Sequence, residues 1–144
     1  MPDVAFHFNA PDRIGYACRL LRKAYLRGAR LVVLVDEADR AALDSALWTV
    51  VVGEFLPHSN PGDPPHVQAH SPIHLASELP AQTGATVLVN LRADMPEGYD
   101  RFARVIEVVT GDETDRGHAR ERWKRYKAQG IEPQRHDLQL TPQD

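Results

Sequence analysis

The chain has 144 residues, of which 42% are hydrophobic and 26% charged, with a single cysteine and a formal net charge of −3. These values are typical of one globular domain over residues 1–144. They exclude intrinsic disorder, coiled coil and a disulfide-rich secreted scaffold. The longest apolar run, 31–35, is far shorter than the ~20 residues of a membrane-spanning helix. The N-terminus shows no basic region followed by an apolar stretch, so we expect a cytoplasmic protein without a membrane span.

Positive charge is concentrated near the C-terminus. Residues 116–127 contain six basic residues and one acidic residue, whereas the other 132 residues carry a net charge of −8. An acidic chain of this kind is poorly suited to coat nucleic acid through bulk charge. The local basic segment is better suited to a specific acidic ligand.

The first elements follow in the order strand, helix, strand. Residues 4–8 are typical of a strand, and the turn residues 9–12 supply a helix N-cap. Apolar residues at spacings of three and four predict an amphipathic helix over 14–26, which Gly28 ends. The nearly unbroken apolar run 29–35 is typical of a parallel strand that is buried on both faces.

The middle of the chain is less regular. The helical pattern repeats over 36–48, and a further strand is predicted around 50–56. Residues 57–72 contain five prolines, which exclude regular helix there and predict a long surface connection. Within this connection, residues 67–69 carry a strand signal.

The last third of the chain returns to an alternation of strands and helices. We expect strands over 86–91 and 105–110, a short helix over 96–103, a final helix over 114–129 and an edge strand over 136–140. Taken together, the elements predict an α/β fold: a three-layer sandwich with a mostly parallel sheet and a Rossmann-like topology.

The chemistry of common α/β enzymes is missing from the sequence. Neither GxxxxGK nor GxGxxG occurs, and Asp12 places a negative charge in the first turn, where a phosphate would have to sit. Cys18 falls on the apolar stripe of the first helix, which favours a core residue over a nucleophile. No serine lies in a GxSxG motif. We therefore expect no catalytic residue and no cofactor, and favour a binding function.

Four of the seven histidines lie in the proline-rich connection: His58, His66, His70 and His74. The last three are four residues apart, a spacing that would align metal ligands on a helix. The prolines argue against that helix, and no cysteine or carboxylate lies among these three residues. Solvated loop or strand-edge histidines are thus favoured, and a metal-dependent enzyme that uses this loop remains an alternative.

The final predicted helix carries the strongest binding signal. One face holds Arg116, Arg120, Trp123, Lys124 and Lys127 at helical spacing. The stripe shows no acidic partners at this spacing, so a negatively charged ligand would relieve its self-repulsion, and the indole adds an apolar anchor. An acidic peptide and a single-stranded nucleic acid both fit. The alternative is a solvated helix face whose cations suit the helix dipole.

A second candidate surface follows the second predicted helix. Trp48 stands at the end of that helix, and Phe55 lies close to Pro57. These large side chains either close the core or form an exposed apolar patch that a protein partner covers.

Several segments of the chain resemble the chi subunit of the bacterial DNA polymerase III holoenzyme. The most specific are LDSALW at 43–48, FLPH at 55–58 and ARERWKRY at 119–126, and the strand segments at 6–8, 31–36 and 87–91 also match. The resemblance implies a non-catalytic accessory subunit of the clamp-loader assembly, with polymerase activity in another subunit. It further implies an indirect link to DNA through the single-stranded-DNA-binding protein.

The resemblance also implies which residues bind which partner. The acidic C-terminal tail of the single-stranded-DNA-binding protein is expected to dock on the last helix. Arg120 and Lys124 would hold its carboxylates, and Trp123 with Val109 would wall a pocket for its terminal phenylalanine. The basic rim would extend to Arg116 and Lys127. A separate surface for the psi subunit would include Trp48, Phe55 and Pro57.

Overall fold

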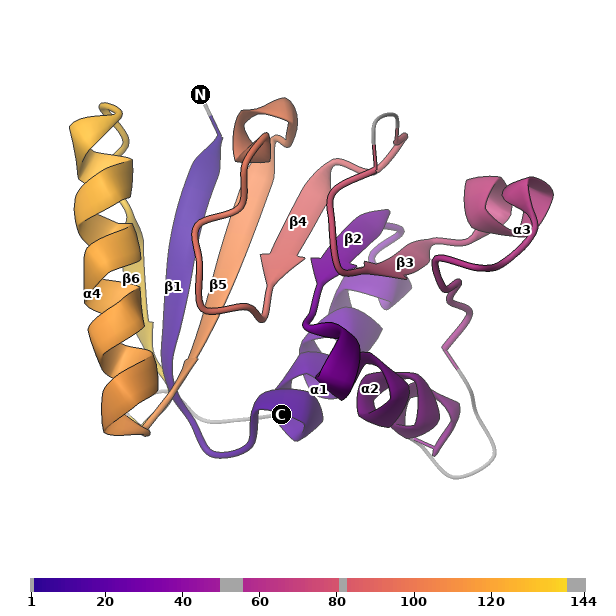
Figure 1. The fold of residues 1–144 in the computed structure, drawn as a ribbon, viewed down its shortest axis with the longest axis horizontal. Coiled ribbons are helices and arrows are strands. Elements are labelled where there is room, and N and C mark those ends of the chain that lie inside the picture. Colours follow the sequence, from indigo (N-terminus) through magenta and orange to yellow (C-terminus); the bar gives the residue numbers. More distant parts are fainter. Residues whose placement is uncertain (1, 50–55, 81–82, 140–144) are drawn as a thin grey trace.

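The structure is a computed structural model that describes residues 2–49, 56–80 and 83–139. Within these residues six strands form one sheet, in which all neighbours run parallel in the order β3-β2-β4-β5-β1-β6 (Figure 1). The strands are β1 (Asp3–Ala10), β2 (Leu31–Leu34), β3 (Ile73–Ala76), β4 (Val87–Asn90), β5 (Arg104–Thr110) and β6 (Gln134–Asp137). The helices are α1 (Arg13–Leu26), α2 (Glu37–Thr49), α3 (Pro65–His70), the 3-10 helix η1 (Tyr99–Arg101) and α4 (Glu113–Ala128).

Helices pack on both faces of the sheet. α1 and α2 lie on one face and α4 on the other (Figure 1). Because side chains alternate along a strand, β2 serves both layers: Leu31 and Val33 pack with the α1 and α2 side, whereas Val32 and Leu34 pack with the α4 side. This arrangement confirms the predicted α/β sandwich with a parallel sheet. No described helix is long and apolar enough to cross a membrane.

Helix α1 begins and packs as the sequence predicts. The side chain of Asp12, its N-cap, accepts a hydrogen bond from the backbone N–H of Gly15 at 3.1 Å. A Cβ atom on Gly15 would lie 2.6 Å from that carboxylate, so a larger residue there would displace the Asp12 side chain from its capping position. Cys18 is buried in the core beneath α1, and burial raises the pKa of its thiol to about 11, as expected of a core residue rather than a nucleophile.

The proline-rich connection differs from the prediction. Residues 65–70 form helix α3, so the exclusion of helix and the strand signal at 67–69 are both wrong. Pro65 stands in the first turn, where a missing N–H costs nothing, and Pro72 lies beyond the last turn. The neighbouring strand is β3, which the sequence analysis did not predict. The strand expected around 50–56 falls almost entirely outside the described residues.

Two later elements are shorter or shifted. The helix expected over 96–103 is the three-residue η1, and the edge strand lies at 134–137 rather than at 136–140. β6 pairs with β1, and the backbone N–H of Leu138 still donates to the carbonyl of Phe8. The pairing therefore begins before the apolar residues that suggested the strand.

Candidate functional site

Helix α4 is fixed at its N-terminus by two aspartates. The side chain of Asp112, the N-cap, accepts a hydrogen bond from the backbone N–H of Asp115 at 3.0 Å. Asp115 accepts hydrogen bonds from the backbone N–H and the hydroxyl of Thr110, at 2.8 and 3.0 Å, and pairs with Arg13 of α1 at 2.7 Å. Burial raises the pKa of Asp115, but the Thr110 hydrogen bonds and Arg13 outweigh it and hold this pKa below its ordinary value. These contacts set the start of α4 relative to β5 and α1.

A buried polar network holds the inner face of α4. The Glu107 carboxylate on β5 accepts hydrogen bonds from Arg122 Nε at 2.9 Å, the Tyr126 hydroxyl at 2.7 Å and the Asn90 amide at 2.8 Å. Arg122 Nη1 also donates to the Ala93 carbonyl at 2.6 Å. Burial raises the pKa of Glu107, and the Arg122 guanidinium acts in the opposite direction. Because Arg122 is only 2% exposed, it is not available to a ligand, although it belongs to the basic segment.

The outer face of α4 presents four exposed cations: Arg116, Arg120, Lys124 and Lys127. The expectation that this stripe lacks acidic partners is wrong. The pairs are Arg120 with Glu113 at 3.3 Å, Lys124 with Glu121 at 3.5 Å and Lys127 with Glu132 at 3.6 Å. These partners lie three, five or seven positions away instead of four. All six side chains are more than half exposed, so the pairs are screened by solvent and an acidic ligand can displace them.

Trp123 lies half-buried among these cations. Its ring packs on Phe6 and Phe8 of β1, with centroid distances of 5.1 and 6.3 Å. The guanidinium of Arg135 on β6 lies over the Phe8 ring, 5.2 Å from its centroid. Neither Phe8 nor Arg135 was expected at this surface from the sequence. The alternation in Phe6-His7-Phe8 was the available signal, because it directs both phenylalanines to the face that α4 covers.

Val109 lies beneath this surface and not in it. Its side chain is completely buried in the core cluster against which Trp123 packs. It supports the aromatic residues from below and offers no exposed atom to a ligand. The structure thus brings Arg120, Trp123 and Lys124 to one face of α4, with Val109 behind them.

The second surface is a groove at the end of α2, with a volume of about 410 Å³. Trp48 is 55% exposed there, so it forms a surface patch and does not close the core. Its ring contacts that of His58 at a centroid distance of 5.6 Å, and His58 Nε2 lies 2.7 Å from the Asp44 carboxylate. Pro57 lines the same groove. Phe55 lies outside the described residues.

Comparison with known proteins identifies the family. Residues 1–134 match the family model described as DNA polymerase III chi subunit, HolC. The chain is 33% identical over 127 residues to the DNA polymerase III subunit chi of Pseudomonas aeruginosa, covering 88% of this chain and 87% of that protein. The chain belongs to the chi subunit family of DNA polymerase III. The chi subunits of Escherichia coli and Haemophilus influenzae are each 27% identical to it, over 116 and 115 residues, which cover 79% of this chain and 78% and 79% of theirs.

Membership of the chi family confirms the resemblance drawn from the motifs at 43–48, 55–58 and 119–126. The structure gives two of these motifs a physical meaning. LDSALW forms the end of α2 with Trp48 at the groove, and ARERWKRY forms the part of α4 that carries both the buried Arg122 and the exposed cations. The chain is therefore classed as an accessory subunit of the replicative polymerase.

The histidine-rich segment of this chi-family chain is divided among several contacts. His66 and His70 stand on α3, where the sequence analysis did not expect a helix, and His74 Nδ1 lies 2.7 Å from the Ser59 hydroxyl. Within residues 2–49, 56–80 and 83–139, no three histidine, cysteine or acidic side chains are grouped as metal ligands. Nothing in this part of the structure supports the metal-dependent alternative.

Proposed function

We propose that this chi-family chain is a non-catalytic adaptor that binds the acidic C-terminal tail of the single-stranded-DNA-binding protein. It would link that protein to the clamp loader in the bacterial cytoplasm and so reach DNA indirectly, without a cofactor. The observation that supports the proposal best is the half-buried Trp123 among exposed cations on α4. In this arrangement Arg120 and Lys124 hold the tail carboxylates, and Arg116 and Lys127 extend the basic rim.

The apolar part of the surface gives the tail its anchor. Exposed ion pairs alone contribute little and are screened by salt. A terminal phenylalanine ring that packs beside Trp123 and Phe8 adds apolar burial, and Val109 keeps these rings in place from beneath. The cations then steer association and fix the direction of the tail, whereas the rings slow its release.

We also propose the groove at the end of α2 as the docking surface for the psi subunit. The exposed Trp48 supports this, because a large indole ring at the wall of an open groove is typical of a surface that a protein partner covers. Pro57 lines the groove beside it, and Phe55 is assigned to the surface by its place in the motif. Trp48→Ala would remove binding of purified psi subunit and leave tail binding unchanged. Loss of tail binding in this variant would contradict two separate surfaces.

The tail site is tested with a labelled peptide that ends in Asp-Ile-Pro-Phe. Fluorescence anisotropy would follow its titration with the full chain at several salt concentrations. Arg120→Glu should weaken binding by about tenfold or more, since it replaces a contacting cation with an anion. Arg125→Glu is the matched control: the residue is exposed on the same helix and the charge change is identical, but it lines a different cavity, beside Tyr99.

Two results would contradict the tail site. Equal losses of affinity in Arg120→Glu and Arg125→Glu would mean that only net charge matters. Equal affinity for a peptide that lacks the terminal phenylalanine would remove the apolar anchor. Because the chain has two tryptophans, a Trp48→Phe variant makes Trp123 the sole indole, and its fluorescence should change when the peptide binds.

A further inference from the structure

A second basic segment lies near the N-terminus. Residues 13–30 contain six basic residues and no acidic residue: Arg13, Arg19, Arg22, Lys23, Arg27 and Arg30. Outside this segment and residues 116–127, the chain carries a net charge of −14. The two segments of net positive charge therefore lie along and just after α1 and along α4, and these helices pack on opposite faces of the sheet (Figure 1).

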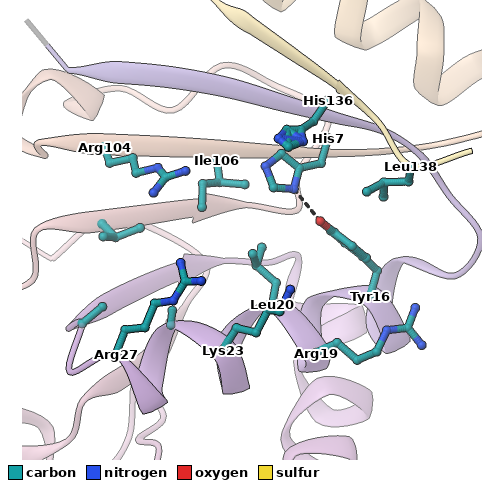
Figure 2. A pocket seen from close by; sticks show the side chains of 13 residues that line it. His7, Tyr16, Arg19, Leu20, Lys23, Arg27, Arg104, Ile106, His136 and Leu138 are labelled. Atoms are coloured by element: carbon teal, nitrogen blue, oxygen red, sulfur yellow. Dashed lines mark hydrogen bonds between the residues drawn. The ribbon is translucent and has the colours of Figure 1, made fainter. Parts of the chain in front are cut away.

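Three cations of this segment, two on α1 and one at its C-cap, border a cavity of about 390 Å³. Arg19, Lys23 and Arg27 follow at intervals of four residues, so they stand along one edge of the helix with a rise of about 6 Å from each to the next. Arg104, at the start of β5, faces them from the sheet. Figure 2 shows the three α1 side chains spread along the helix and Arg104 on the strand opposite.

The sheet forms the other side of the cavity and supplies rings and aliphatic carbon. Ile106 and Leu138 line it, and the His7 and His136 rings lie with their centroids 5.0 Å apart. His7 Nδ1 is hydrogen bonded to the Tyr16 hydroxyl across the cavity (Figure 2). All thirteen lining residues are described, and none of them is acidic.

His7 and His136 lie in a positively charged environment. Burial, with a smaller effect of the neighbouring His136 and Arg104, lowers the pKa of His7 to about 4. His7 is therefore neutral at pH 7 and contributes a ring and a hydrogen bond, not a charge. The charge of the cavity comes from the lysine and the three arginines at its rim.

We propose that this cavity, the α1 groove, binds a single strand of nucleic acid through its phosphates. Three cations in a row along a helix suit a chain of phosphates better than one isolated anion. The exposed His136 ring and the half-buried Tyr16 ring, beside aliphatic side chains, suit unpaired bases, which stack without sequence preference.

An extended acidic peptide fits the α1 groove less well. Its backbone N–H groups would need acceptors, and the lining side chains are cations, rings and aliphatic groups, with no carboxylate or amide among them. A nucleic-acid strand has no such row of backbone donors. The α1 groove is separate from the outer face of α4, and the proposal does not depend on the tail site.

The experiment measures binding of a labelled oligothymidylate of about 15 nucleotides to the full chain by anisotropy, at low salt and then with increasing salt. The logarithm of the association constant should fall with the logarithm of salt concentration with a slope of roughly −2 to −3, as for three or four phosphate contacts on a single strand. A Lys23→Glu/Arg27→Glu variant should lose at least about tenfold in affinity, and Arg27→Lys, which keeps the charge, should bind nearly as wild type. The imidazole NMR signals of His7 and His136 should shift on binding.

The matched control is Arg120→Glu/Lys124→Glu on α4, which lowers the net charge by the same amount. It should keep oligonucleotide binding and lose tail-peptide binding, whereas the α1 variant should do the reverse. If the tail peptide does not bind at α4, the proposal for the α1 groove can therefore still be tested. No oligonucleotide binding by the wild-type chain at low salt, or equal losses in the two variants, would overturn the proposal. Tighter binding of a polyglutamate peptide than of the oligonucleotide in the α1 groove would overturn the ligand class.

Discussion

Removing Arg122 should destabilise the protein strongly and in a pH-dependent way. Arg122→Met keeps most of the side-chain volume but leaves the fully buried Glu107 without its cation and frees the Ala93 carbonyl. Breaking a buried pair by removing one partner costs about 3–5 kcal/mol. The pKa of Glu107 is already raised by burial, and without Arg122 it rises further. Protonation then relieves the charge, so at low pH the cost falls toward that of the lost hydrogen bonds, about 1–3 kcal/mol.

The direction of this pH dependence follows from proton linkage. An acid whose folded pKa lies above its unfolded value binds more protons when folded, so stability decreases as pH rises above the ordinary glutamate value of 4.5. Urea unfolding of wild type and Arg122→Met at pH 5 and pH 8 should therefore give a larger difference at pH 8. Arg125→Met, an exposed change on the same helix, should cost less than about 0.5 kcal/mol at both pH values. An Arg122→Met cost that is below 1 kcal/mol, or equal at the two pH values, would refute the reasoning.

Three further outcomes test other parts of the fold. The pKa of Asp115 is lower in the folded protein than its ordinary value of 3.8, so its ionised form stabilises the protein at pH values above 3.8. This contribution is lost as pH falls through the folded pKa. Asp115→Asn should therefore lower stability in urea unfolding at pH 7 and have less effect at more acidic pH. Gly117→Ala, with open space around its Cβ, should raise Tm by helix propensity, whereas Gly15→Ala should not, because its Cβ displaces the Asp12 cap. Cys18 should react with a thiol reagent at pH 8 much more slowly in the folded protein than in urea, and equal rates would contradict its burial and raised pKa.

The sequence predicts most of the sheet because its strands carry strong apolar patterns. The predicted ranges 29–35 and 86–91 contain β2 and β4, and the range 105–110 matches β5 to within one residue, since buried parallel strands need continuous apolar side chains. The prediction is wrong at 65–70, where the number of prolines argued against a helix. Proline excludes helix only in the interior, and Pro65 stands in the first turn.

The candidate site was predicted in outline but not in its charge contacts. Helical periodicity places Arg120, Trp123 and Lys124 on one face because all three belong to a single helix. The pair between Lys127 and Glu132 reaches past the end of α4, and a rule based on spacing within the helix cannot find it. Arg135 over Phe8 depends on the pairing of β6 with β1, which joins residues far apart in the sequence.

Strand β1 contributes side chains to both cationic surfaces, which lie on opposite faces of the sheet. Because its side chains alternate, Phe6 and Phe8 support Trp123 on the α4 side, whereas His7 lies in the α1 groove on the other side. An acidic tail bound on α4 and a nucleic-acid strand bound in the α1 groove would then occupy opposite faces of one sheet and would not compete for the same atoms. The remaining residues, with their net charge of −14, would repel a polyanion from the rest of the surface. The small net charge of −3 is thus the sum of two local cationic surfaces and an acidic remainder, an arrangement that favours binding at defined places over coating by bulk charge.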